Sequence, residues 1–196
     1  SETILAIGAS TGGTEAIKYL LMQFPAAMPA IVITQHMPPG FTKTFATRLN
    51  SLCQVRVKEA EQGERLLAGC AYIAPGDQHL EVIRVGADYR VRLHQQERVS
   101  GHRPSVDVLF QSLAHSAGVN TVALILTGMG RDGAEGMLRL ARQGCYTLAQ
   151  DEASCVGFGM PKEAIKLNAV SEVLGLDQLG DAVIQRLNAL CAATGL

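Results

Sequence analysis

Short buried segments alternate with amphipathic segments along much of this chain, and that alternation constrains the fold more than any other feature. Residues 4–8, 30–34 and 121–126 are apolar runs of strand length. Continuous apolar runs are typical of parallel strands that are covered on both faces. Segments with apolar residues at helical spacing follow them, at 14–24, 40–52 and 134–143. The pattern predicts βαβ units and an α/β fold with a doubly wound, mostly parallel sheet.

The middle of the chain departs from this alternation. Residues 80–85 and 89–93 have strand character on either side of the turn Gly86-Ala87-Asp88, which predicts an antiparallel hairpin beside the parallel sheet. No linker, repeat or low-complexity stretch divides the chain, so we expect a single domain over residues 1–196. The remaining predicted strands are 55–57, 71–74 and 146–149, and the remaining helices are 106–117 with Ser105 as its cap, 161–167 and 177–192.

Composition excludes several classes of function. The formal net charge is −1 with dispersed basic residues, whereas nucleic-acid binding usually needs a concentrated basic face. No apolar run approaches the roughly 20 residues that cross a bilayer, so we expect no direct membrane insertion. The five cysteines show no CxxC pair and the histidines lack ligand spacing, so we expect reduced thiols, no metal and no cofactor. Reduced thiols indicate a cytoplasmic protein.

The turn after the first predicted strand has the form of a nucleophile elbow. Gly8-Ala9-Ser10-Thr11-Gly12 fits G-x-S-x-G, in which small residues permit a tight turn that lifts the serine hydroxyl above the sheet. A phosphate-binding or purely structural turn is the alternative. However, the G-K-[ST] of a Walker loop is absent, and a dinucleotide fingerprint would put glycine at position 10.

Three side chains are predicted to reach one edge of the sheet. Ser10 follows the first strand, His36 the second and Asp132 the strand 121–126, and the carboxyl ends of neighbouring parallel strands open onto one crevice. They are suited to act as nucleophile, general base and orienting carboxylate. Taken singly, His36 could be a capping or surface histidine, and Asp132 a helix N-cap. His102 is the main rival for the base and Asp151 for the carboxylate.

Two peptide groups are candidates for an oxyanion hole. Gly128 and Gly130 let the backbone approach a ligand closely, so the N–H of Met129 could point into the crevice together with that of Thr11. A purely structural turn with Met129 in packing is an equal alternative at this point.

Five motifs in order resemble the catalytic domain of bacterial chemotaxis protein-glutamate methylesterases, over essentially the whole chain. The resemblance implies a serine hydrolase whose triad is Ser10, His36 and Asp132, with oxyanion contacts near Thr11 and Met129. The motifs are Ile7-Gly8-Ala9-Ser10-Thr11-Gly12-Gly13, Gln35-His36-Met37-Pro38, Tyr72-Ile73-Ala74-Pro75-Gly76, Leu126-Thr127-Gly128-Met129-Gly130-Arg131-Asp132-Gly133 and Gly159-Met160-Pro161.

The resemblance also implies a substrate and partners. Methylated glutamates on the cytoplasmic domain of methyl-accepting chemoreceptors would be hydrolysed, and certain receptor glutamines deamidated. An N-terminal phosphorylatable receiver domain is expected in the full-length protein and is absent from this chain. His102, Arg103 and Arg131 are candidate substrate contacts, although a structural or solvated role is an equal alternative for each arginine. A nucleotide-binding module and a non-catalytic interaction module remain the alternatives to a hydrolase.

Overall fold

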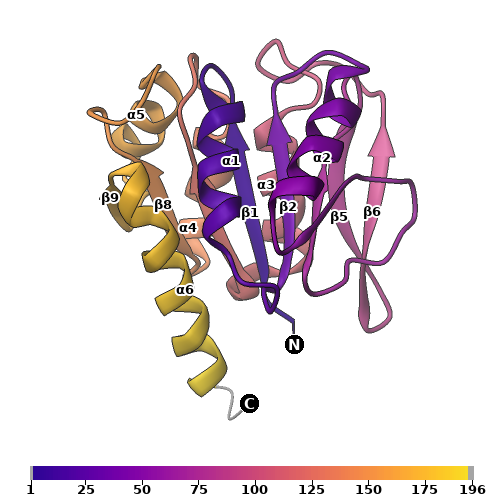
Figure 1. Ribbon diagram of the computed structural model, residues 1–196. Helices are drawn as coiled ribbons and strands as arrows, with labels where there is room; N and C mark the ends of the chain where they lie inside the picture. The colour runs from indigo at the N-terminus through magenta and orange to yellow at the C-terminus, as the bar shows by residue number, and fades with distance from the viewer. Residues whose placement is uncertain (1, 194–196) are drawn as a thin grey trace.

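A seven-stranded parallel sheet forms the middle layer of the protein (Figure 1). Its strand order is β3-β4-β2-β1-β7-β8-β9, and every neighbouring pair runs parallel. The structure is a computed structural model that describes residues 2–193. The prediction of an α/β fold with a mostly parallel sheet is confirmed. The strands are β1 Ile4–Ala9, β2 Ala30–Gln35, β3 Arg56–Glu59, β4 Cys70–Ile73, β7 Thr121–Ile125, β8 Tyr146–Gln150 and β9 Glu172–Leu174.

Helices cover both faces of the sheet, which explains why the central strands are apolar throughout. Helices α1, α2 and α6 lie on one face and α3 and α4 on the other (Figure 1). Leu5 and Ile7 of β1 belong to one apolar core, and Ile4 and Ala6 belong to the other, so alternate residues of β1 are buried in different cores. Within residues 2–193, none of the helices combines the length and the apolar character needed to cross a bilayer. The helices are α1 Gly13–Gln23, α2 Phe41–Leu52, α3 Val106–Ser116, α4 Ala134–Arg142, α5 Gly159–Lys166 and α6 Leu176–Ala193, with a 3-10 turn at Gly118–Asn120.

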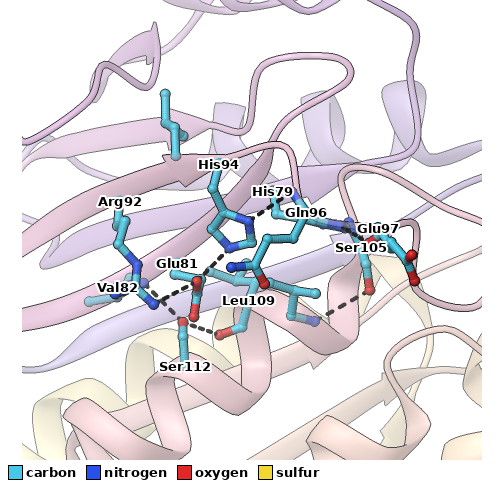
Figure 2. Close-up of polar contacts among 12 residues, drawn as sticks. His79, Glu81, Val82, Arg92, His94, Gln96, Glu97, Ser105, Leu109 and Ser112 are labelled. Carbon is cyan, nitrogen blue, oxygen red and sulfur yellow. Dashed lines mark hydrogen bonds and ion pairs between the residues drawn. The ribbon is translucent and has the colours of Figure 1, made fainter.

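The predicted hairpin is confirmed as a separate two-stranded sheet. Strands β5 His79–Val85 and β6 Asp88–His94 are antiparallel and pack against helix α3. Leu80 and Val82 of β5 are buried in the same core as Phe110 of α3. The N–H of Val82 also donates a hydrogen bond of 2.9 Å to the Ser112 hydroxyl of α3 (Figure 2). The hairpin therefore packs against helix α3 through both apolar contacts and a hydrogen bond.

One strand was not predicted, and one helix begins earlier than expected. Strand β9 has only three residues and is largely exposed at the edge of the sheet, so it lacks the apolar pattern of a buried strand. Helix α5 begins at Gly159 rather than at Pro161. Pro161 still lies in its first turn, where the missing N–H has no helical acceptor.

The strand order places β1 between β2 and β7. The connection after β1 leads to one side of the sheet and that after β7 to the other, so the chain changes winding direction between these strands. Ligand sites in open α/β sheets lie at the carboxyl ends of strands at such a point. The loops that carry Ser10, His36 and Asp132 all begin at this edge.

Candidate active site

Ser10 and His36 follow directly from a pair of hydrogen-bonded strand ends. In the register of β1 and β2, Ala9 lies opposite Gln35, so Ser10 and His36 are the next residues on strands about 4.8 Å apart. The N–H of His36 donates to the Ala9 carbonyl at 3.2 Å. The Gln35 amide donates to the Ser10 carbonyl at 2.9 Å. The backbone at Ser10 is therefore fixed against the end of β2.

The turn around Ser10 depends on glycine at a close approach. The Ser10 N–H donates to the Thr127 carbonyl at 2.9 Å, which brings the loop after β7 against the serine. A Cβ atom added to Gly128 would lie 2.9 Å from the Ser10 Cβ and would collide with the sulfur of Met160. Gly12, at φ 80°, adopts the left-handed conformation that ends the turn before α1. The candidate nucleophile is thus held between two tightly packed loops.

His36 and Asp132 are in direct contact. His36 Nε2 lies 2.7 Å from Asp132 Oδ2, and the two side chains are 8% and 1% exposed. A carboxylate only accepts hydrogen bonds, so Nε2 carries a proton, and in the neutral form of the ring Nδ1 is bare. Nδ1 is buried and has no hydrogen-bond partner among residues 2–193. It is the free basic atom of the ring.

The N-terminus of helix α3 surrounds the other side of the Asp132 carboxylate. Oδ1 accepts hydrogen bonds from the Ser105 hydroxyl at 2.8 Å and the Asp107 N–H at 2.9 Å, and Oδ2 accepts one from the Val106 N–H at 2.8 Å. Burial alone would raise the pKa of Asp132. The hydrogen bonds from His36 and from the Asp107 and Val106 N–H groups outweigh burial and hold the pKa below its ordinary value of 3.8.

His102 lies over the face of the His36 ring. The two ring centroids are 3.6 Å apart with an interplanar angle of 6°. Burial, followed by the charge of His36, lowers the pKa of His102. His102 therefore lies at the site, as a stacking partner that limits how the His36 ring can tilt. It does not replace His36 in the contact with Asp132.

Thr127 organises the region where an oxyanion would lie. Its hydroxyl donates to the Thr11 carbonyl at 2.8 Å and accepts the N–H groups of Val156 and Gly157, each at 3.0 Å. Thr11 is exposed, and Met129 is 57% exposed. In the described part of the chain, the N–H groups of Thr11 and Met129 have no protein acceptor. Both peptide groups are free to bind a ligand oxygen.

The other sequence candidates lie elsewhere or make other contacts. Arg103 is bound by Asp77 Oδ1 at 2.7 Å and by two main-chain carbonyls, a geometry that fixes its loop. Arg131 is exposed beside Asp132, and we find no side-chain partner for it within residues 2–193. Asp151 accepts hydrogen bonds from the N–H and hydroxyl of Ser154 and closes a turn after β8. Asp132, not Asp151, is the carboxylate that meets His36.

Three residues at the site were not assigned a role by the sequence analysis. Gln35 and Thr127 lie inside two of the recognised motifs, but nothing in the sequence distinguishes their roles from those of the other motif residues. His79 directly precedes the predicted hairpin strand 80–85 and carries no motif, yet its Nδ1 accepts the Ser105 N–H at 3.1 Å, directly behind Asp132. That contact depends on where the hairpin packs, which no local pattern encodes.

The cysteines and acidic residues make no competing site in the described residues. Among the described residues, no disulfide joins Cys53, Cys70, Cys145, Cys155 or Cys191. Burial raises the pKa values of Cys145 and Cys155 to about 11, so these thiols are poor nucleophiles at neutral pH. Over residues 2–193, no group of three or more His, Cys, Asp or Glu side chains is arranged to hold a metal ion.

Comparison with known proteins gives concordant results from sequence and from structure. Residues 5–183 match the protein family described as CheB methylesterase. The chain is 59% identical over 189 residues to a protein-glutamate methylesterase/protein-glutamine glutaminase of Salmonella typhimurium, and 60% identical over 188 residues to that of Yersinia pestis. These alignments cover 96% of the chain and 54% of each relative, so the chain spans about half of their length. The crystal structure of the Thermotoga maritima CheB methylesterase catalytic domain superposes with a TM-score of 0.92 at 39% identity, covering 94% of this chain and 98% of that one.

Proposed function

This chain belongs to the CheB methylesterase family, and from that premise we propose that it hydrolyses glutamyl methyl esters on proteins with Ser10 as the nucleophile. One observation carries the proposal. His36 binds Asp132 through Nε2 at 2.7 Å while its buried Nδ1 has no partner among the described residues, at the strand end next to Ser10. A neutral imidazole held in this tautomer has the free basic nitrogen that a general base needs, and the strand register places Ser10 on the neighbouring strand end.

The first half of the reaction forms an acyl-enzyme. The Ser10 oxygen attacks the ester carbonyl carbon while its proton passes to His36 Nδ1. Asp132 stabilises the imidazolium that results. This arrangement reverses the ring relative to trypsin-like triads, in which Nδ1 faces the carboxylate and Nε2 the serine. The tetrahedral intermediate collapses with loss of methanol, whose oxygen receives the proton from His36.

The N–H groups of Thr11 and Met129 would bind the oxygen that gains negative charge in the intermediate. Donors that are already oriented stabilise the transition state more than the substrate, and the loss of one such donor typically costs about 10²–10³-fold in kcat. The tie between Thr127 and the Thr11 carbonyl supports this assignment, because it fixes the turn that carries one donor.

Water then completes the cycle. His36 accepts a proton from water as the water oxygen attacks the acyl carbon, and the Ser10 oxygen then leaves and takes that proton from His36, with glutamate as the product. The same steps hydrolyse a glutamine side chain if ammonia leaves instead of methanol. Deamidation therefore needs no additional residue, which agrees with the double name of the relatives.

We propose the cytoplasmic domain of methyl-accepting chemoreceptors as the substrate protein and the cytoplasm as the location. Five cysteines without a disulfide among residues 2–193 support a reducing compartment. We also propose that an N-terminal receiver domain of the same protein regulates this site, since the chain spans about half the length of its relatives. The exposure of Thr11, Met129 and Arg131 at the rim suits a substrate presented on a protein surface.

Methanol release from methylated receptor tests the proposal. Ser10→Ala should abolish release while leaving thermal stability close to that of the wild type, because only one half-buried hydroxyl is removed. Release by Ser10→Ala at a rate comparable to the wild type would show that Ser10 is not the nucleophile. A thermal-shift assay with nucleotides distinguishes a hydrolase from the nucleotide-binding alternative. Loss of activity in Ser10→Ala distinguishes a hydrolase from a non-catalytic module.

A further inference from the structure

The position of the Asp132 carboxylate depends on where helix α3 begins. Three of the four hydrogen bonds that this carboxylate accepts come from consecutive residues, Ser105, Val106 and Asp107. The fourth comes from His36. A shift of the first turn of α3 would therefore move the carboxylate relative to the imidazole that it orients.

The first turn of α3 is itself held by a histidine of the hairpin. The N–H of Ser105, the N-cap residue of α3, donates to His79 Nδ1 at 3.1 Å (Figure 2). His79 Nε2 lies 2.9 Å from the Glu97 carbonyl, on the chain segment that follows the hairpin. His79 and Ser105 are both fully buried. The imidazole thus joins the loop at Glu97 to the backbone that cradles Asp132.

Only one protonation state of His79 satisfies both contacts. An N–H group can donate only to an unprotonated ring nitrogen, so Nδ1 is bare, and a carbonyl accepts only from a protonated one, so Nε2 carries the hydrogen. Burial lowers the pKa of His79, which favours the neutral ring that this geometry requires. Within residues 2–193, His79 Nδ1 is the acceptor found for the main-chain N–H of Ser105.

We propose that His79 is a positioning residue of the active site, which holds Asp132 in line with His36 by anchoring Ser105. The contacts run from His79 Nδ1 to Ser105, from Ser105 to Asp132, and from Asp132 to His36 Nε2. His79 is not a catalytic residue, because it contacts neither Ser10 nor the candidate oxyanion donors. The expected change in kcat rests on the proposed function. The expected change in the position of Asp132 rests on the contacts alone.

Two amide variants separate the roles of the two ring nitrogens. His79→Asn can place a carbonyl oxygen near the position of Nδ1 and so keep an acceptor for Ser105. His79→Gln can place its amide nitrogen near Nε2 and keep the donor to Glu97, but it leaves the Ser105 N–H without that acceptor. Ser112→Ala is the matched control, because it removes a buried hydrogen bond between the same hairpin and helix without touching Ser105.

The test combines a spectroscopic readout with kinetics in the same proteins. The proton on His36 Nε2, bound to Asp132, should give a low-field NMR resonance that persists in His79→Asn and Ser112→Ala and is shifted or lost in His79→Gln. On methylated receptor, His79→Gln should lower kcat by about 10–100-fold with little change in KM, since small misplacement of a catalytic group costs this much. His79→Asn should keep kcat within about threefold of the wild type.

Three results would overturn the inference. The first is an unchanged resonance and an unchanged kcat in His79→Gln. The second is an equal loss of kcat in His79→Asn and His79→Gln at equal thermal stability. The third is a loss of kcat in Ser112→Ala as large as that in His79→Gln. The resonance needs no substrate. If the wild type released no methanol, the proposed function would fail while the comparison of resonances still decided the role of His79.

Discussion

Replacing Asp132 with asparagine should both misdirect His36 and destabilise the fold, because every lone-pair direction of this carboxylate is used. Oδ2 accepts from His36 Nε2 and the Val106 N–H, and Oδ1 from the Ser105 hydroxyl and the Asp107 N–H. If the new NH₂ group replaces Oδ2, His36 must accept through Nε2 and carry its proton on Nδ1, where it cannot act as a base. If it replaces Oδ1, the serine hydroxyl can turn and accept, but the Asp107 N–H meets a donor.

Either orientation leaves one backbone N–H without an acceptor in a buried site. Such a group costs about 1–3 kcal/mol, and for a domain of this size each kcal/mol lowers Tm by about 2–4 °C. We therefore expect Tm to fall by about 2–12 °C. Where the NH₂ group faces His36, the loss in kcat should be on the order of 10⁴, as in other Ser-His-Asp triads whose aspartate is replaced by asparagine.

Methanol release and thermal melts on the same preparation measure both effects. Asp151→Asn is the matched control, because Asp151 only closes a turn with Ser154, and its kcat should stay near that of the wild type. An Asp132→Asn protein that keeps both kcat within about tenfold of the wild type and the wild-type Tm would refute the argument, because each orientation of the amide leaves a buried N–H without an acceptor and one of them also gives the wrong tautomer.

Other substitutions test the surroundings of the site. Gly128→Ala should lower kcat by about 10²-fold or more, because the added methyl group would push on Ser10 and Met160; unchanged kinetics would contradict the close packing. Thr127→Val should lower the free energy of unfolding by about 1–3 kcal/mol or more, because it strips an acceptor from two N–H groups; denaturant melts with an unchanged midpoint would speak against this. Burial and the His36 ring hold the pKa of His102 below 6.5, so at lower pH the unfolded chain takes up a proton that the folded chain resists. The free energy of unfolding should therefore decline from about pH 7 to pH 5, and His102→Phe should decline less over the same range; equal slopes would remove His102 as a cause.

The broad arrangement of the site could be predicted because it depends on strand ends. Apolar runs 4–8, 30–34 and 121–126 mark buried parallel strands, and whatever follows such strands reaches one edge. The contact between His36 and Asp132 follows from that rule and from the placement of β1 between β2 and β7.

The details that tune the site could not be predicted, because they depend on packing between distant elements. Which nitrogen of His36 faces Asp132 is set by the ring's orientation under His102. The donors from α3 and the contact of His79 with Ser105 require the hairpin to lie against α3, and no spacing in the chain specifies that position. Strand β9 was missed for a simpler reason, since its exposed residues carry no apolar signal.

The most direct test of the central claim is the rate and place of reaction with a fluorophosphonate, which labels an activated serine and loses fluoride. Mass spectrometry of the digested protein should find the adduct on Ser10 alone in the wild type, and the labelling rate should fall steeply in His36→Gln and Asp132→Asn. An adduct on another residue, or labelling of Ser10 at the wild-type rate without the imidazole of His36, would contradict the account.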